Sequence, residues 1–105
     1  MANPIAMRHT TALKTANQIV IERLEQALAA ARELDKQGYA LVPGGVDVNA
    51  VRPTLEVQPD GHCRQLIEQR RAVYFHCGIS PVAGRFRAGQ FPLGDCRVVW
   101  LEKGH

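Results

Sequence analysis

Apolar and polar residues between Thr10 and Gln37 alternate with the period of an α-helix. Apolar side chains recur at alternating steps of three and four residues, with Asn17 in the one polar position: Leu13, Asn17, Val20, Leu24, Ala27, Ala31 and Leu34. Gly38 then supplies a usual helix end signal. The spacing predicts a long helix over residues 10–37 that begins at Thr10 or Thr11 and is about 40 Å long.

Beyond Gly38 the period changes to two, which is typical of short strands. Turn signals at residues 43–45 and 59–61 separate these strands. Residues 62–71 fit either a strand or a short helix capped by Asp60. We therefore predict an α+β fold in a single domain over residues 1–105. One long N-terminal helix packs on a small, mainly antiparallel sheet of four to five strands, within a sheet region over residues 39–103.

The length of the predicted helix has a structural consequence. A sheet of short strands covers about 20 Å along the strand direction, so part of the apolar stripe projects beyond its own sheet. A second copy of the same helix is the simplest cover, and a polar seam residue such as Asn17 sets the register of paired helices. We predict a homodimer whose interface consists of the seven stripe residues given above.

The net charge of +3 lies entirely in the second half of the chain. Residues 1–51 carry five basic and five acidic residues, whereas residues 52–105 carry eight basic and five acidic ones. Arginine suits carboxylate, phosphate and aromatic partners and is enriched at protein interfaces. We predict that a protein-binding module uses these arginines as its contact: Arg64, Arg70, Arg71, Arg85 and Arg87.

Nucleic acid is the alternative partner for a basic sheet face. Strand alternation places Arg85 and Arg87 on one face and Phe86 on the other. On this pattern the arginines track phosphates, while Phe86 and its neighbours Tyr74 and Phe75 point into the core. That arrangement leaves no platform on which bases stack.

Two adjacent His-Cys pairs and one further cysteine are the candidate metal ligands: His62, Cys63, His76, Cys77 and Cys96. A small zinc-binding domain is the second alternative, but adjacent side chains of a strand point to opposite faces and do not share one ion. We predict that the cysteines pack inward and that the protein holds no metal and no cofactor.

The remaining chemistry favours a protein that is not an enzyme. Ser80 is the only serine, and no glycine-rich phosphate loop or close pair of carboxylates is present, so we predict no catalytic residues. The odd number of cysteines and the lack of a long apolar run predict a cytoplasmic protein without membrane contact.

The stretch "QFPLGDCRVVWLE", residues 90–102, resembles the carboxy-terminal part of small accessory proteins of phages and prophages. The resemblance covers at most the last fifty residues, and Phe91 and Asp95 depart from the pattern. It implies a cytoplasmic protein that acts by binding, as an inhibitor that occupies the surface of a host or defence protein. In the same stretch, we predict that Trp100 is a buried anchor between helix and sheet.

Overall fold

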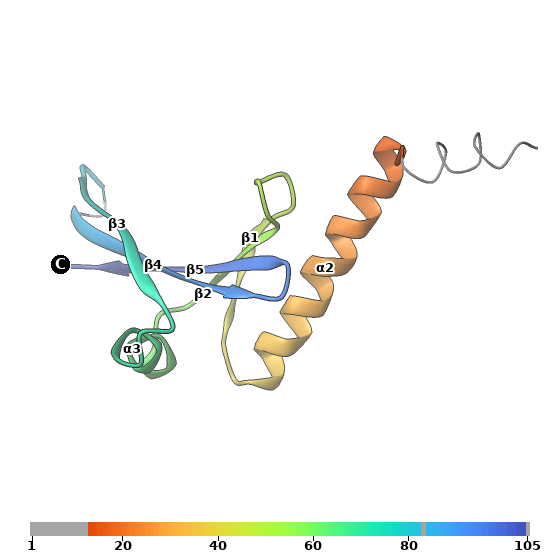
Figure 1. Ribbon diagram of the computed structural model, residues 1–105. Coiled ribbons are helices and arrows are strands. Elements are labelled where there is room, and N and C mark those ends of the chain that lie inside the picture. Colours follow the sequence, from red (N-terminus) through yellow and green to blue (C-terminus); the bar gives the residue numbers. More distant parts are fainter. Residues whose placement is uncertain (1–12, 83, 105) are drawn as a thin grey trace, which may run out of the picture.

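The computed structural model describes residues 13–82 and 84–104 of the chain. These residues form two helices and one five-stranded sheet (Figure 1). The long helix comes first, two strands follow, and a short helix separates them from the last three strands. This order confirms the predicted α+β class. Neither helix is long and apolar enough to cross a membrane, within the part of the chain described.

The long helix, α2, spans Ala16–Lys36 and is 21 residues long, or about 32 Å. It begins at a capping box in which Thr15 Oγ1 accepts from the Gln18 backbone N–H, and the Gln18 side chain accepts from the Thr15 N–H. The predicted start is therefore wrong, because residues 13–15 precede the helix; Thr10 and Thr11 lie outside the described residues. The predicted end is confirmed by Gly38, which follows the helix with a φ of 91°.

Only the second half of α2 packs on the sheet. Its buried residues are Ala27, Ala30 and Leu34, and none lies in the first half of the helix. The first half is tethered instead by Arg23, whose guanidinium donates to the backbone carbonyls of residues 48, 50 and 51 at 2.6–3.2 Å. The helix therefore extends past the sheet that supports it, as Figure 1 shows.

The sheet has the strand order β1-β2-β5-β4-β3. Its strands are β1 Leu41–Asp47, β2 Thr54–Val57, β3 Val73–Ser80, β4 Gly84–Leu93 and β5 Cys96–Lys103. Three neighbouring pairs are antiparallel, and β2 runs parallel to β5. The prediction of a mainly antiparallel sheet is confirmed.

The turn predicted at residues 43–45 is not formed. These residues lie inside β1, where the register against β2 shifts between Leu41 and Val46. Gly44 has a φ of 77°, a left-handed conformation that glycine adopts without steric cost. The Pro-Gly-Gly segment therefore forms an irregularity within an edge strand, where pairing is least constrained.

The ambiguous residues 62–71 form a helix and its termination. Helix α3 spans Gly61–Glu68, and Asp60 caps it by accepting a hydrogen bond of 2.9 Å from the His62 backbone N–H. Beyond its end, the N–H of Arg70 donates to the Ile67 carbonyl and the N–H of Arg71 to the Leu66 carbonyl. This is the Schellman arrangement, in which the first residue past the cap takes a left-handed conformation.

Both helices cover the same face of the sheet. Leu34 of α2 and Leu66 of α3 belong to one core cluster with Val98 and Trp100 of β5. Trp100 is 1% exposed, which confirms its predicted burial. The other face carries no helix from the described residues, and we call it the open sheet face. It presents Val73, Phe75, His76, Phe86, Ala88, Gln90, Arg97, Val99 and Leu101, which alternate with the inward-facing positions.

Candidate functional site

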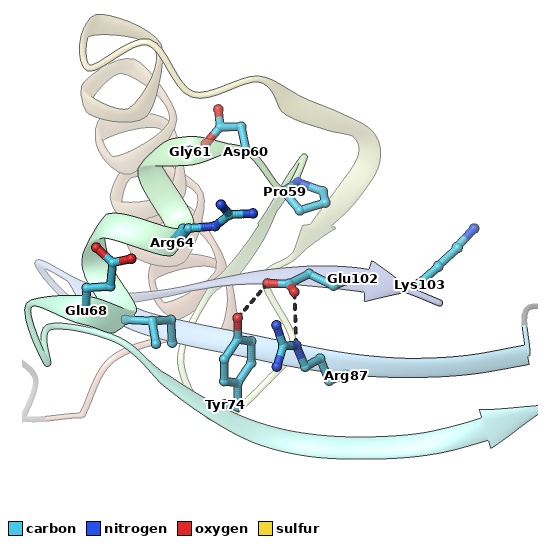
Figure 2. Close-up of a pocket in the computed structure, with 10 residues that line it drawn as sticks. Pro59, Asp60, Gly61, Arg64, Glu68, Tyr74, Arg87, Glu102 and Lys103 are labelled. Atoms are coloured by element: carbon cyan, nitrogen blue, oxygen red, sulfur yellow. Dashed lines mark hydrogen bonds and ion pairs between the residues drawn. The ribbon is translucent and has the colours of Figure 1, made fainter. Parts of the chain in front are cut away.

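A cavity of about 680 Å³ lies between α3 and the strands β3, β4 and β5 (Figure 2). Charged and aromatic residues from all four elements line it: Arg64, Glu68, Tyr74, Arg87, Glu102 and Lys103. Asp60, which caps α3, lines it as well. The cavity lies on the helix-covered side of the sheet, where β4 and β5 run past α3. The lining carries three cations and three carboxylates, so the site is polar and balanced in charge.

Glu102 is the centre of the hydrogen-bond network in this cavity. Its Oε2 accepts from Trp100 Nε1 at 2.7 Å and from the Tyr74 hydroxyl at 2.9 Å, and its Oε1 accepts from Arg87 Nε at 3.0 Å. The Arg87 guanidinium also lies 4.1 Å above the centroid of the Tyr74 ring. Donors from β3, β4 and β5 thus meet at one carboxylate, which ties the three strands together. Figure 2 shows the bonds from Tyr74 and Arg87.

Burial and hydrogen bonding shift the pKa values of Glu102 and Tyr74 in opposite directions, both away from neutral pH. Burial acts to raise the pKa of Glu102, but the hydrogen bonds from Trp100, Tyr74 and Arg87 outweigh it, and the net pKa is lowered. Burial, and then the bond to Glu102, raise the pKa of the Tyr74 hydroxyl. The three donors therefore stabilise the ionised form of Glu102.

The five predicted partner-binding arginines do not form one surface. Arg64 and Arg87 line the cavity of Figure 2, and Arg87 is paired with Glu102. Arg85 is exposed at the start of β4, two residues from Arg87 and on the same face of the sheet. Arg70 and Arg71 are exposed elsewhere, at the end of α3.

A second depression, of about 280 Å³, lies where α3 leads into β3. Four arginines line it: Arg52, Arg70, Arg71 and Arg97. None of its other lining residues is acidic, and the ion pairs found among residues 13–82 and 84–104 include none of these four arginines. Four arginines therefore line one small depression that has no carboxylate in its lining.

The prediction that the aromatic residues of this region face the core is wrong for Phe75 and Phe86. Gly89 lies beneath Trp100 on the helix-covered side, so Phe86, three residues earlier in β4, faces the open side. A register shift between Tyr74 and His76 places Phe75 there as well, with the Arg97 guanidinium 4.5 Å from its centroid. Phe75 is 44% exposed.

The candidate metal ligands are dispersed. Cys63 and Cys96 are buried as predicted, and burial raises the pKa of both thiols. Cys77 is exposed, which contradicts the inward packing predicted for it, because β3 is an edge strand. His76 and Cys77 pair with adjacent residues of β4 and so point to opposite faces. The described ranges contain no group of three or more His, Cys, Asp or Glu side chains placed to hold a metal ion.

The predicted interface stripe on α2 divides into two parts. Ala27 and Leu34 are buried in the chain's own core, so the prediction that they contact a second copy is wrong, and Ala31 packs against the same core. The remaining members are exposed: Leu13, which precedes the helix, and Asn17, Val20 and Leu24. Ile21 and Leu28 extend this exposed part and are each about half-exposed.

Arg52, Arg97 and Phe75 were not predicted as site residues. Arg52 and Arg97 come together because β2 pairs in parallel with β5, which places Pro53 beside Arg97 through a 2.9 Å backbone hydrogen bond. Alternation along β5 does indicate that the side chains of Arg97 and Trp100 lie on opposite faces of the sheet. The parallel pairing itself has no signature in the sequence.

Comparison with known proteins places this architecture in a family. A family model described as "Uncharacterised protein" matches residues 6–103. The chain belongs to that family. The match spans both helices and all five strands, and so covers the cavity, the second depression and the open sheet face together. No curated protein and no solved structure matches the chain.

Proposed function

We propose that the protein is a protein-binding module whose first partner is a second copy of itself, bound through α2. The observation that carries this proposal is the exposed apolar face of the helix, formed by Val20, Ile21, Leu24 and Leu28, each 48–53% exposed. Large aliphatic side chains at these spacings form the seam of paired helices. A face of this kind on a soluble domain marks an interaction site.

The packing of α2 supports the same proposal. Its first half contributes no buried residue, and a short helix without tertiary packing is marginally stable in water. The capping box at Thr15 and the Arg23 tether hold this half in place but do not cover its apolar side chains. A partner helix laid along the face supplies the missing packing.

Charge and polarity favour a second copy as the occupant. Three basic and four acidic residues lie within Ala16–Lys36, so two copies of α2 repel each other only weakly. Asn17 lies at the end of the exposed face and gives the pair a polar group with which to set register.

Pairing through α2 leaves the arginines of the sheet half available to a further partner. The role predicted by the resemblance, inhibition of a host or defence protein, remains a prediction.

The substitution Leu24→Lys tests the proposal, because it places a charge in the centre of the exposed face. We expect the wild-type protein to change from monomer to dimer as its concentration rises from micromolar to millimolar. Leu24→Lys should weaken this association at least about tenfold, because a buried unpaired ammonium is costly. Sedimentation equilibrium gives both dissociation constants, and far-ultraviolet circular dichroism checks that α2 is intact.

Ala29→Lys is the matched control. Ala29 is exposed on the same helix but lies beside Glu25 and Glu33, outside the apolar face. This variant should dimerise as the wild type does. A wild-type protein that stays monomeric at millimolar concentration would overturn the proposal, and so would equal weakening by the two lysines.

A further inference from the structure

We infer that the arginine-lined depression and the adjoining open sheet face bind single-stranded nucleic acid, with phosphates at the arginines and bases against the aromatic side chains. This inference does not depend on α2, because it concerns a different surface. Its first observation is the grouping of Arg52, Arg70, Arg71 and Arg97 without a lining carboxylate. Like charges that line one depression repel one another, and an anion bound among them reduces that repulsion.

The second observation is the aromatic surface beside the arginines. Phe75 lies next to Arg97, whose guanidinium packs on its ring, and Phe75 remains 44% exposed. Farther along the same face, the rings of His76 and Phe86 lie 5.4 Å apart between centroids. Rings and guanidinium planes of this kind are the surfaces on which unpaired bases stack. An acidic protein segment would use the arginines but would gain less from these rings.

The third observation is the backbone at Arg70. This residue has a φ of 59°, the one positive φ among the non-glycine residues described, and occupies the position after a helix end that glycine usually takes. The left-handed conformation is strained for arginine, because its Cβ atom crowds the backbone, and glycine does not have this strain. Backbone strain of this kind clusters at functional sites. Arg70 lines the depression, so the strained residue belongs to the proposed anion site.

The test is fluorescence anisotropy of the full chain with fluorescein-labelled oligothymidylate over a series of salt concentrations. We expect saturable binding at low salt, with the logarithm of the association constant falling linearly with that of the salt concentration. Arg52→Gln and Arg71→Gln should each reduce the steepness of this dependence by about 0.7. Phe75→Ala should weaken binding by about fivefold or more, through lost stacking. Arg85→Gln, an exposed arginine on the other face of the sheet, should leave the salt dependence unchanged.

Three results would overturn the inference. The first is no binding of oligothymidylate at low salt. The second is tighter binding of polyglutamate than of oligothymidylate, with no effect of Phe75→Ala, which would assign the surface to an acidic protein. The third is equal affinity for the oligonucleotide and for a duplex of the same length, since paired bases cannot stack on Phe75.

Arg70→Gly separates a binding role from a structural one. The substitution relieves the left-handed conformation, so the Tm should rise by roughly 2–6 °C, while the salt dependence falls by about 0.7. A residue with only a structural role would not change binding in this way. Arg70→Lys keeps the charge and the backbone cost, and should retain the salt dependence of the wild type. Unchanged binding by Arg70→Gly would remove Arg70 from the site.

Discussion

Replacement of Gly89 by alanine is expected to destabilise the protein by at least about 3 kcal/mol. A Cβ atom at this position would lie 2.1 Å from Cζ2 of Trp100, far inside van der Waals contact. Trp100 is 1% exposed and its indole N–H is bonded to Glu102, so the ring cannot move aside without breaking that bond. Urea denaturation followed by the fluorescence of Trp100, the only tryptophan, measures the change directly.

Two other glycines provide the controls. A Cβ atom at Gly61, the first residue of α3, has no heavy atom within 4 Å, so Gly61→Ala should be neutral or stabilising by about 0.5 kcal/mol. At Gly78 the new atom would lie 3.0 Å from the edge of the Phe86 ring on the open sheet face, where the ring can give way. Gly78→Ala should therefore cost less than about 1 kcal/mol. A Gly89→Ala protein as stable as Gly78→Ala would contradict the packing described.

Periodicity alone predicted the long helix, the class of the fold and the burial of Trp100. These features depend on local spacing and on which face of an element is apolar, both of which can be read along the chain. The boundary of α2 was harder to predict. Thr10, Thr11 and Thr15 all have the chemistry of an N-cap, and Thr15 forms the capping box because Gln18 stands three residues later.

The facing of the strands could not be predicted from alternation alone. Alternation correctly separated Phe86 from Arg85 and Arg87, but it does not say which set faces the helices. That choice follows from the contact between Gly89 and Trp100, two residues that are adjacent only after β4 and β5 pair. With Gly89 on the helix-covered face, Phe86 lies on the open sheet face. The prediction that Phe86 points into the core, which left no surface for stacking bases, is therefore wrong.

The positions of the arginines also depend on strand pairing, which the sequence does not reveal. Arg85 and Arg87 are near neighbours in the chain, yet Arg87 is held by Glu102 in the cavity of Figure 2. Arg52 and Arg97 are far apart in sequence, yet they line one depression because β2 runs parallel to β5. The distribution of charge along the sequence therefore predicted which half of the chain is basic, but not which arginines line the second depression.

Replacement of Glu102 by glutamine is expected to change both the stability of the protein and its response to acid. A glutamine side chain has one acceptor oxygen, so it cannot accept all three hydrogen bonds from Trp100, Tyr74 and Arg87. Its NH2 group would face these donors without an acceptor. The free energy of unfolding at pH 7 should therefore fall by about 1–3 kcal/mol. The folded-state pKa of Glu102 lies below its ordinary value of 4.5. Its ionised form therefore stabilises the fold above that value, and this contribution is lost as the pH falls through the folded-state pKa.

Urea denaturation at a series of pH values between neutrality and strong acid measures this contribution. Wild type should lose stability below about pH 4.5 more steeply than Glu102→Gln, so that the two curves converge in acid. Glu68→Gln is the matched control, since Glu68 is an exposed carboxylate that lines the same cavity. That variant should follow the wild-type curve. If Glu102→Gln and wild type differ by a constant amount at every pH, then Glu102 stabilises the fold by packing alone, and its carboxylate does not act as the charged link between β3, β4 and β5.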